Sequence, residues 1–397
     1  MKKTITDQDN ISYNIADSSK ELIGLTSEEL MQLDYAKQLT VEIYQSAYQK
    51  IHRRGDNIKI PGVLLSDSPE RNFIATNINE TVEELQPVIC HGLVKQLREE
   101  IARRYPAEST QLSEIVGQQI ISELQKGAFE YGIQFLALHE LFHLWHGHDL
   151  WETNFYFDAR GKIVPGNGRE LYSQYKPFVF SLNDSEKEQI RQNKDKFLIV
   201  AHYHLSHQAL EADADRSAIV FLVDQIANGY AGKSIQEKKA YMELQFTSLS
   251  AALLTVNNIF HHNERRSYSF ASLPKDMSEI DHPTPAIRFF LEQNQIRTDI
   301  EKKIRDRVIR QIAIDGMTKM IEHENDICKQ DGEVYPFFAT AYCNIGQNKV
   351  LSLRMRYNQI LPSLQQYADC RLDKIYPASD FNIRKEDIRY SDSGEIL

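Results

Sequence analysis

The chain has 397 residues, of which 42% are hydrophobic and 26% charged, and such a chain can bury a large core. The formal net charge of −10 disfavours a general nucleic-acid-binding protein, because a phosphate backbone would be repelled unless a basic patch overrode the field. The start of the chain lacks the apolar stretch of a signal peptide, segment 244–260 is too polar to span a membrane, and the four cysteines are scattered. We therefore expect a soluble cytoplasmic protein that binds neither nucleic acid nor membrane.

The first hundred residues predict helices and one short pair of strands. Thr26 and Glu29 form a capping box that predicts the start of a helix. Apolar runs at 63–65 and 73–76 predict a short β-hairpin or strand pair, and a second helix is expected over 87–104. If the protein is a peptidase, one strand of this hairpin could hold substrate by strand addition; a purely structural hairpin fits the sequence equally well.

The motif H-E-x-x-H at 139–143 lies in an apolar segment that predicts a buried helix over 127–148. His139 and His143 are one helical turn apart on one face, about 6 Å along the axis, so both imidazoles can bind one tetrahedral Zn²⁺. Glu140 lies beside that position, where its carboxylate can act as general base toward a metal-activated water. A structural helix with two satisfied histidines is the alternative, but an ionised glutamate is costly in an apolar helix.

Segment 151–183, rich in aromatic residues, glycine and proline, predicts a long irregular insertion after this helix. It could form a lid or a substrate-binding wall, or simply cover the core. Segment 184–229 then predicts one long helix or two.

Within that helical segment, residues at intervals of three or four positions place polar side chains on one face: His204, His207, Glu211 and Asp215. We expect Glu211 to be the third zinc ligand, and Asp215, one turn later, to orient a ligand histidine. His207 is the rival third ligand, or a donor that stabilises the oxyanion of the transition state. Among the other histidines, His148 could support a ligand, but structural or surface roles are favoured for it and for His146.

The remaining segments form a predicted C-terminal part. A turn with two prolines at 281–285 opens a helix, and it could either cap that helix or bring His282 or Arg288 near the site. Segment 297–329 predicts an amphipathic helix interrupted at Gly316.

These motifs, in order along the chain, resemble those of the HtpX, CAAX-prenyl-protease and Oma-type metallopeptidases. They are His139-Glu140-x-x-His143 with His148, Glu211-x-x-Ala214-Asp215, and His282-Pro283-x-x-x-x-Arg288. Lit-type phage-exclusion peptidases are similar in carrying such a core without membrane helices. The resemblance covers residues 60–295 approximately, and it implies a gluzincin-type site with His139, His143 and Glu211 as zinc ligands and Glu140 as catalytic base. Because the chain lacks transmembrane segments, a membrane-embedded prenyl-protein substrate is not expected.

Together these features predict a mostly α (α+β) protein with a zincin-like metallopeptidase core, a small β element and a helical C-terminal extension. The predicted division is a peptidase domain at 1–295 and the extension at 296–397. The predicted function is a zinc-dependent endopeptidase that hydrolyses peptide bonds of a protein or peptide substrate. The alternative is a catalytically silent metal-binding regulatory protein, whose zinc site a fourth protein ligand such as His207 would close.

Overall fold

The computed structural model describes residues 3–6, 12–51, 59–69, 73–77, 85–109, 120–180, 194–265, 285–330, 344–370 and 372, and this part of the chain is mostly helical. The helices are α1 Ser27–Ile51, α2 His91–Arg104, α4 Ile121–His146, α5 His148–Asn154, α6 Gly168–Phe180, α8 Lys194–Gly229, α9 Ile235–Arg265, α10 Pro285–Lys303, α11 Arg307–Gln330 and α13 Asn344–Leu364. The strands are β1 Lys3–Thr6, β2 Ser12–Ala16, β3 Leu64–Ser66, β4 Phe73–Asn77, β5 Leu85–Cys90, β6 Phe155–Phe157 and β7 Ile163–Pro165.

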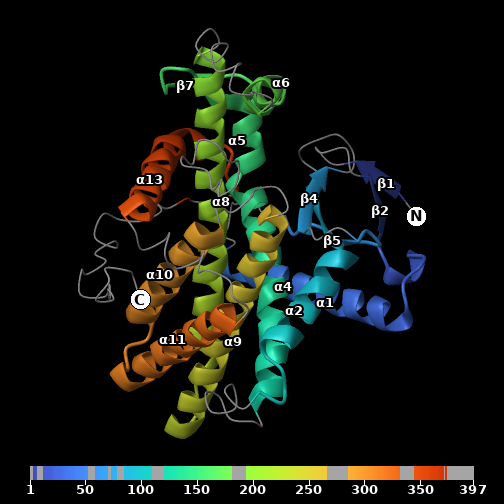
Figure 1. Ribbon diagram of the computed structural model, residues 1–397, viewed down its shortest axis with the longest axis vertical. Coiled ribbons are helices and arrows are strands. Elements are labelled where there is room, and N and C mark those ends of the chain that lie inside the picture. The colour runs from blue at the N-terminus through green and yellow to red at the C-terminus, as the bar shows by residue number, and fades with distance from the viewer. Residues whose placement is uncertain are drawn as a thin grey trace.

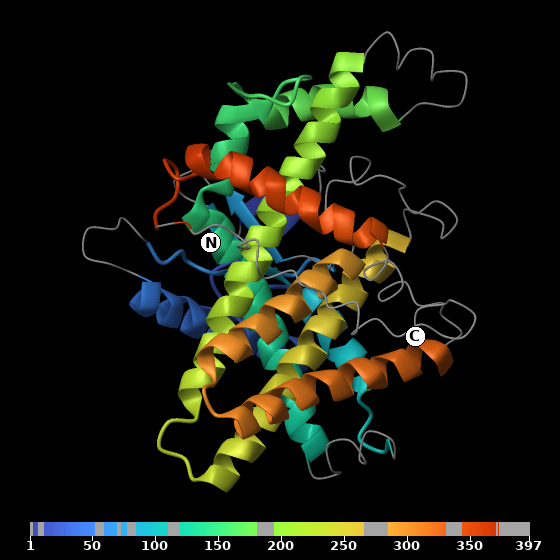
Figure 2. The same ribbon diagram turned by 90° about the vertical axis from the view of Figure 1, so that its left-hand side faces the viewer.

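Three long helices form the centre of the molecule. Helix α8 runs along the longest dimension and α4 packs against it, while α9 packs on α4 (Figure 1). Helices α10 and α11 pack on α8 and α9 respectively. Helix α13 crosses α8 closer to the end that carries α5 and α6 (Figure 2). Most buried apolar side chains of α1, α2, α4, α9 and α11 belong to one continuous core, so these helices stabilise one another.

Close approach between these helices depends on glycine. A Cβ at Gly127 of α4 would lie 2.6 Å from Ser248 Oγ of α9, and one at Gly316 of α11 would lie 2.8 Å from Thr247 Oγ1. The predicted interruption at Gly316 is wrong: α11 continues through this residue, because the missing side chain lets two helices pack closely. The break in the predicted helix falls instead at 304–306, between α10 and α11.

A five-stranded mixed sheet lies beside α1, α2 and α4, in the order β1-β2-β3-β5-β4. The predicted hairpin is wrong, because β5 lies between its two expected strands and pairs parallel with β3 and antiparallel with β4. The helix expected over 87–104 begins only at His91, since residues 85–90 form β5. The apolar sequence of residues 85–90 is compatible with a strand and with a helix, and the pairing with β3 and β4 decides for a strand.

The motif-bearing helix α4 ends at His146. Gly147 adopts a left-handed conformation with φ 71° and ψ 30°, and its N–H caps the carbonyls of His143 and Leu144. The chain then turns into α5, so the helix predicted over 127–148 is two helices. The predicted irregular insertion at 151–183 is likewise wrong, because its described residues form the end of α5, the β6–β7 hairpin and α6.

The predicted capping box is present in the structure. The Thr26 N–H donates to Glu29 Oε2 at 2.8 Å, and the Glu29 N–H donates to Thr26 Oγ1 at 3.2 Å, which completes the capping box. The predicted boundary between 295 and 296 falls inside α10, which packs on α8 and α9. Among the described residues, no helix is long and apolar enough to cross a membrane.

Candidate metal centre

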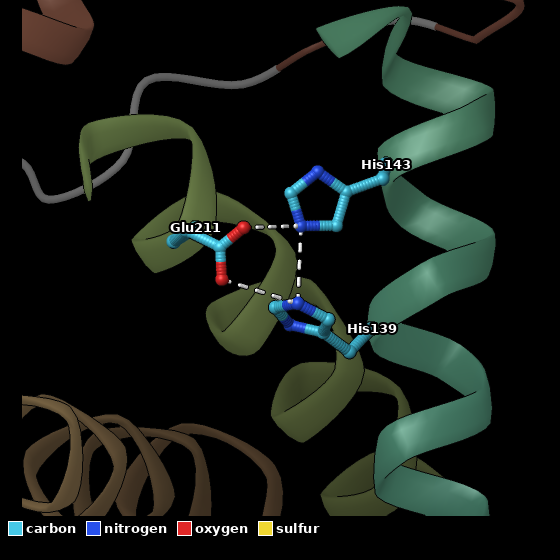
Figure 3. A group of neighbouring side chains, drawn as sticks. All are labelled: His139, His143 and Glu211. Atoms are coloured by element: carbon cyan, nitrogen blue, oxygen red, sulfur yellow. Dashed lines mark hydrogen bonds and ion pairs between the residues drawn. The ribbon is translucent and has the colours of Figure 1, made fainter. Parts of the chain in front are cut away.

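Two histidines of α4 and one glutamate of α8 face one another (Figure 3). His139 Nε2 and His143 Nε2 are 3.0 Å apart; Glu211 Oε2 lies 3.4 Å from the former and Glu211 Oε1 lies 3.2 Å from the latter. Tetrahedral zinc with bonds of about 2.0–2.2 Å separates its ligand atoms by about 3.3–3.6 Å. The three donors therefore have the chemistry and nearly the spacing of one metal site, and small side-chain movements would suffice to admit an ion.

This group is nearly enclosed by protein. His139 and Glu211 are each only 6% exposed, and His143 is half-buried. Within the described part of the chain, no fourth protein donor is close to all three ligand atoms. A bound metal would therefore keep a coordination position that these residues do not fill, as catalytic zinc sites do.

The residues of the group shift one another's pKa values. Burial raises the pKa of Glu211, but His143 and His139 outweigh this effect and hold the pKa well below its usual range. Burial lowers the pKa of His139, whereas the carboxylates of Glu211 and Asp215 raise it to about 10. In the metal-free protein a proton therefore occupies His139, and a metal would have to displace it.

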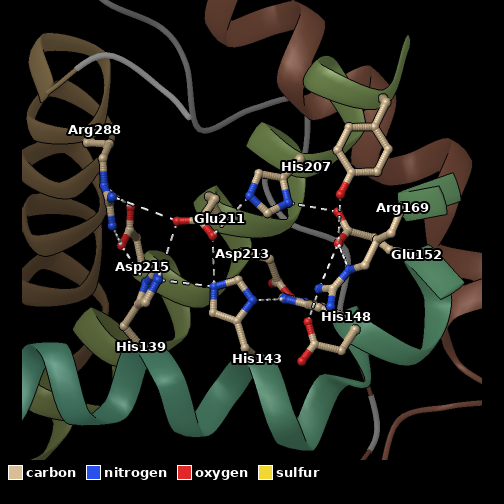
Figure 4. Close-up of polar contacts among 12 residues, drawn as sticks. His139, His143, His148, Glu152, Arg169, His207, Glu211, Asp213, Asp215 and Arg288 are labelled. Carbon is tan, nitrogen blue, oxygen red and sulfur yellow. Dashed lines mark hydrogen bonds and ion pairs between the residues drawn. The ribbon is translucent and has the colours of Figure 1, made fainter. Parts of the chain in front are cut away.

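In each candidate ligand histidine, the Nδ1 atom contacts a supporting residue outside the three-donor group (Figure 4). For His139 the support is Asp215, whose Oδ1 lies 2.8 Å from His139 Nδ1. Arg288 of α10 holds the same carboxylate with two bonds, from Nε to Oδ2 at 2.8 Å and from Nη2 to Oδ1 at 2.6 Å. The nearby carboxylate favours a proton on His139 Nδ1, and Nε2 faces the group.

For His143 the support is a chain of three residues. His143 Nδ1 lies 2.9 Å from His148 Nδ1, and His148 Nε2 lies 3.1 Å from Asp213 Oδ2. The same carboxylate oxygen lies 2.6 Å from His146 Nδ1. Burial lowers the pKa of His148 to about 4, so its ring is neutral and carries one N–H.

The single N–H of His148 fixes which atom donates in each of these hydrogen bonds. The carboxylate of Asp213 can only accept, so His148 donates from Nε2 and accepts at Nδ1. The proton between the two rings then belongs to His143 Nδ1, and His143 Nε2 is the ring nitrogen that faces Glu211. His146, His148 and Asp213 also form a group that could hold a metal. Binding there through His148 Nε2 would move its proton to Nδ1, against the N–H of His143, so we assign this group to orientation.

His207 lies one turn before Glu211 on α8, with its Nε2 3.8 Å from Glu211 Oε1. Its Nδ1 is 2.7 Å from Glu152 Oε1, and Arg169 Nε donates to the other oxygen of Glu152 at 2.9 Å. Burial lowers the pKa of His207, but the Glu152 carboxylate raises it to about 9. His207 is therefore a cation at neutral pH that lies next to Glu211 but outside the three-donor group.

Glu140 is half-buried on α4, within electrostatic range of His139, His143 and Glu211. Burial raises its pKa, and the two histidines reverse this only in part. A carboxylate with a raised pKa is a better proton acceptor near neutral pH than an ordinary one.

The structure brings together His139, His143 and Glu211, and it places Asp215, His207, Glu140 and Arg288 around them. His282 lies outside the described residues. Sequence reasoning missed Asp213, Glu152 and Arg169. Asp213 had one detectable signal: it is an acid between two alanines, off the polar face that contains Glu211 and Asp215.

Compared with protein-family models, curated proteins and solved structures, the chain gives no match. What the site does is therefore argued from its own residues.

Proposed function

We propose that the protein is a zinc-dependent peptidase with a zincin-like core of the gluzincin type. The observation that carries this proposal is the three-donor group of His139, His143 and Glu211, which lacks a fourth described donor and has Glu140 within electrostatic range. Two neutral imidazoles, a carboxylate and an open position are what hydrolytic zinc requires.

Zinc held by these residues would polarise a peptide carbonyl and lower the pKa of a coordinated water to about 7. Glu140 would accept the proton released as water attacks, and would deliver it to the leaving amine. His207, cationic and next to Glu211, would donate from Nε2 to the negative charge that develops on the carbonyl oxygen. Asp215 and His148 would keep the two ligand rings oriented throughout.

The sheet offers a place for an extended substrate. Strand β4 is the last strand on its side of the described sheet, pairs only with β5, and contacts α4. An extended peptide added alongside β4 would form backbone hydrogen bonds with it and lie near the helix that carries Glu140. We propose a protein or peptide segment without secondary structure as the substrate class.

The test is the zinc content of the purified protein, measured by mass spectrometry for wild type, Glu211→Ala and Glu123→Ala. Glu123 is an exposed glutamate in the first turn of α4 and serves as the matched control. We expect about one zinc per chain in wild type and control, and a loss in Glu211→Ala. Full occupancy in Glu211→Ala would move the third ligand elsewhere, and no zinc in any variant after reconstitution would refute the metal centre.

A further inference from the structure

A cavity of about 340 Å³ lies between α1, α4, α8 and α10, and none of the three candidate metal ligands lines it. Its volume is at the lower end of the range of about 300–1,000 Å³ that small-molecule sites occupy. His146 and Asp213, the far end of the chain that orients His143, form part of its wall. The cavity is thus separate from the metal centre, although the two share these supporting residues.

One part of the cavity wall is apolar. Phe142 of α4, Val220 and Phe221 of α8, and Leu372 contribute to it. The ammonium group of Lys50 lies over the ring of Phe221, 4.9 Å from the ring centroid. The apolar surface therefore continues directly into the charged part of the wall. A ligand that fills the cavity can therefore bury an apolar body.

The charged part of the wall is rich in cations. Lys50, Arg216 and Lys303 line the cavity from three different helices. Asp224 pairs with both lysines, and its distance to Lys303 Nζ is 3.1 Å, so one carboxylate serves two ammonium groups. Burial and the charge of Lys303 lower the pKa of Lys50 to about 8, as expected where cations are crowded.

Arg216 provides a separate indication of a ligand. Its Nε atom is buried and has no hydrogen-bond partner among the described residues. The guanidinium is therefore not paired with a described acceptor at Nε, and its positive charge adds to that of the cavity wall.

The other carboxylates near the cavity do not supply that acceptor. Asp213 already accepts from His146 and His148. Asp299 lies within electrostatic range of Arg216 and Lys303, but it accepts from Gln295 at 2.9 Å, and burial raises its pKa. Among the residues that the structure describes, the cations of the wall therefore exceed the carboxylates available to them.

We propose that this cavity binds a small organic anion, whose carboxylate or phosphate group contacts Arg216 and Lys303 and whose apolar part packs against Phe142 and Leu372. Both parts are required: the cations select the negative charge, and the apolar wall selects against a bare inorganic ion.

The experiment is calorimetric titration of the full-length protein with octanoate, octyl phosphate, octanol and inorganic phosphate. We expect both octyl anions to bind, the neutral alcohol and inorganic phosphate to bind about tenfold to a hundredfold more weakly, and the stronger of the two anions to identify the head group. Because none of His139, His143 and Glu211 lines the cavity, the result should be the same with zinc and with chelator, which separates it from the test of the metal centre.

Variants decide whether the cavity is the site. Arg216→Met and Lys303→Met should each weaken octyl-anion binding about tenfold, whereas Lys302→Met, an exposed neighbour on α10, should not. Ser217→Leu, which adds bulk to the wall and keeps the charges, serves if the charge variants fail to fold. Equal affinity for octanol and octanoate, absence of binding, or binding unchanged in Arg216→Met and in Ser217→Leu would overturn the proposal.

Discussion

His143 and His148 face each other through their Nδ1 atoms at a distance of 2.9 Å, although they come from different helices. Gly147 makes this possible, because its left-handed conformation ends α4 and turns the chain so that His148 begins α5 beside the ring of His143. A second imidazole thus sets the tautomer of a candidate ligand.

The first prediction concerns this contact. His148→Phe keeps a ring of similar size but offers no acceptor to His143 Nδ1, so the zinc affinity should fall about tenfold to a hundredfold. Competition with a chromogenic chelator would measure it. The control is His91→Phe, a buried histidine of α2 outside the centre; an equal loss in both variants would contradict the orienting role of His148.

The second prediction separates chemistry from metal binding. Glu140→Gln should keep zinc and the folded state, and should lower hydrolysis of an unfolded protein substrate by at least about a hundredfold, because the amide cannot accept a proton. The readout is release of peptides from a fluorescently labelled, unfolded substrate. Wild-type rates in this variant would exclude Glu140 as the base and favour a regulatory protein with a silent metal site.

The third prediction concerns the buried pair behind His139. Arg288→Met removes two bonds to Asp215 and leaves its carboxylate buried, with His139 as its remaining cationic contact among the described residues. We expect the free energy of unfolding to fall by about 3–5 kcal/mol, measured by urea denaturation. The double variant Arg288→Met/Asp215→Leu should recover part of this loss. A double variant less stable than Arg288→Met would show that the uncompensated charge is not the cause.

The fourth prediction concerns the pH dependence of stability in chelator-treated protein. Because the pKa of His207 is raised to about 9, its interaction with Glu152 stabilises the folded state fully below pH 6.5, and this contribution disappears as pH rises through 9. The stability lost in His207→Gln should be largest near pH 6, at most about 3 kcal/mol, and should shrink toward pH 10.

His202→Gln is the control for that experiment. Burial and the charge of Arg356 lower the pKa of His202, so its effect on stability should be constant above pH 6.5. Thermal unfolding from pH 6 to 10 measures both variants. A His207→Gln difference that does not vary with pH would contradict a protonated His207.

Local spacing in the sequence was enough to place the centre of the site. The interval of four residues between His139 and His143, and again between Glu211 and Asp215, puts each pair on one helical face whatever the rest of the chain does. The capping box at Thr26 and the helical periodicity of α8 are local in the same sense. Interactions within one or two turns of a helix do not need the fold.

Only the tertiary structure decided which faces meet. The packing of α4 against α8 brings Glu211 to the two ligand histidines and brings Asp213, which is off the predicted polar face, to His146. The turn at Gly147 then places His148 beside the same carboxylate. The position of β5 between β3 and β4, and the cavity shared by α1, α4, α8 and α10, likewise depend on residues far apart in the chain. Such contacts follow from the burial of many apolar side chains at once, and no single motif encodes them.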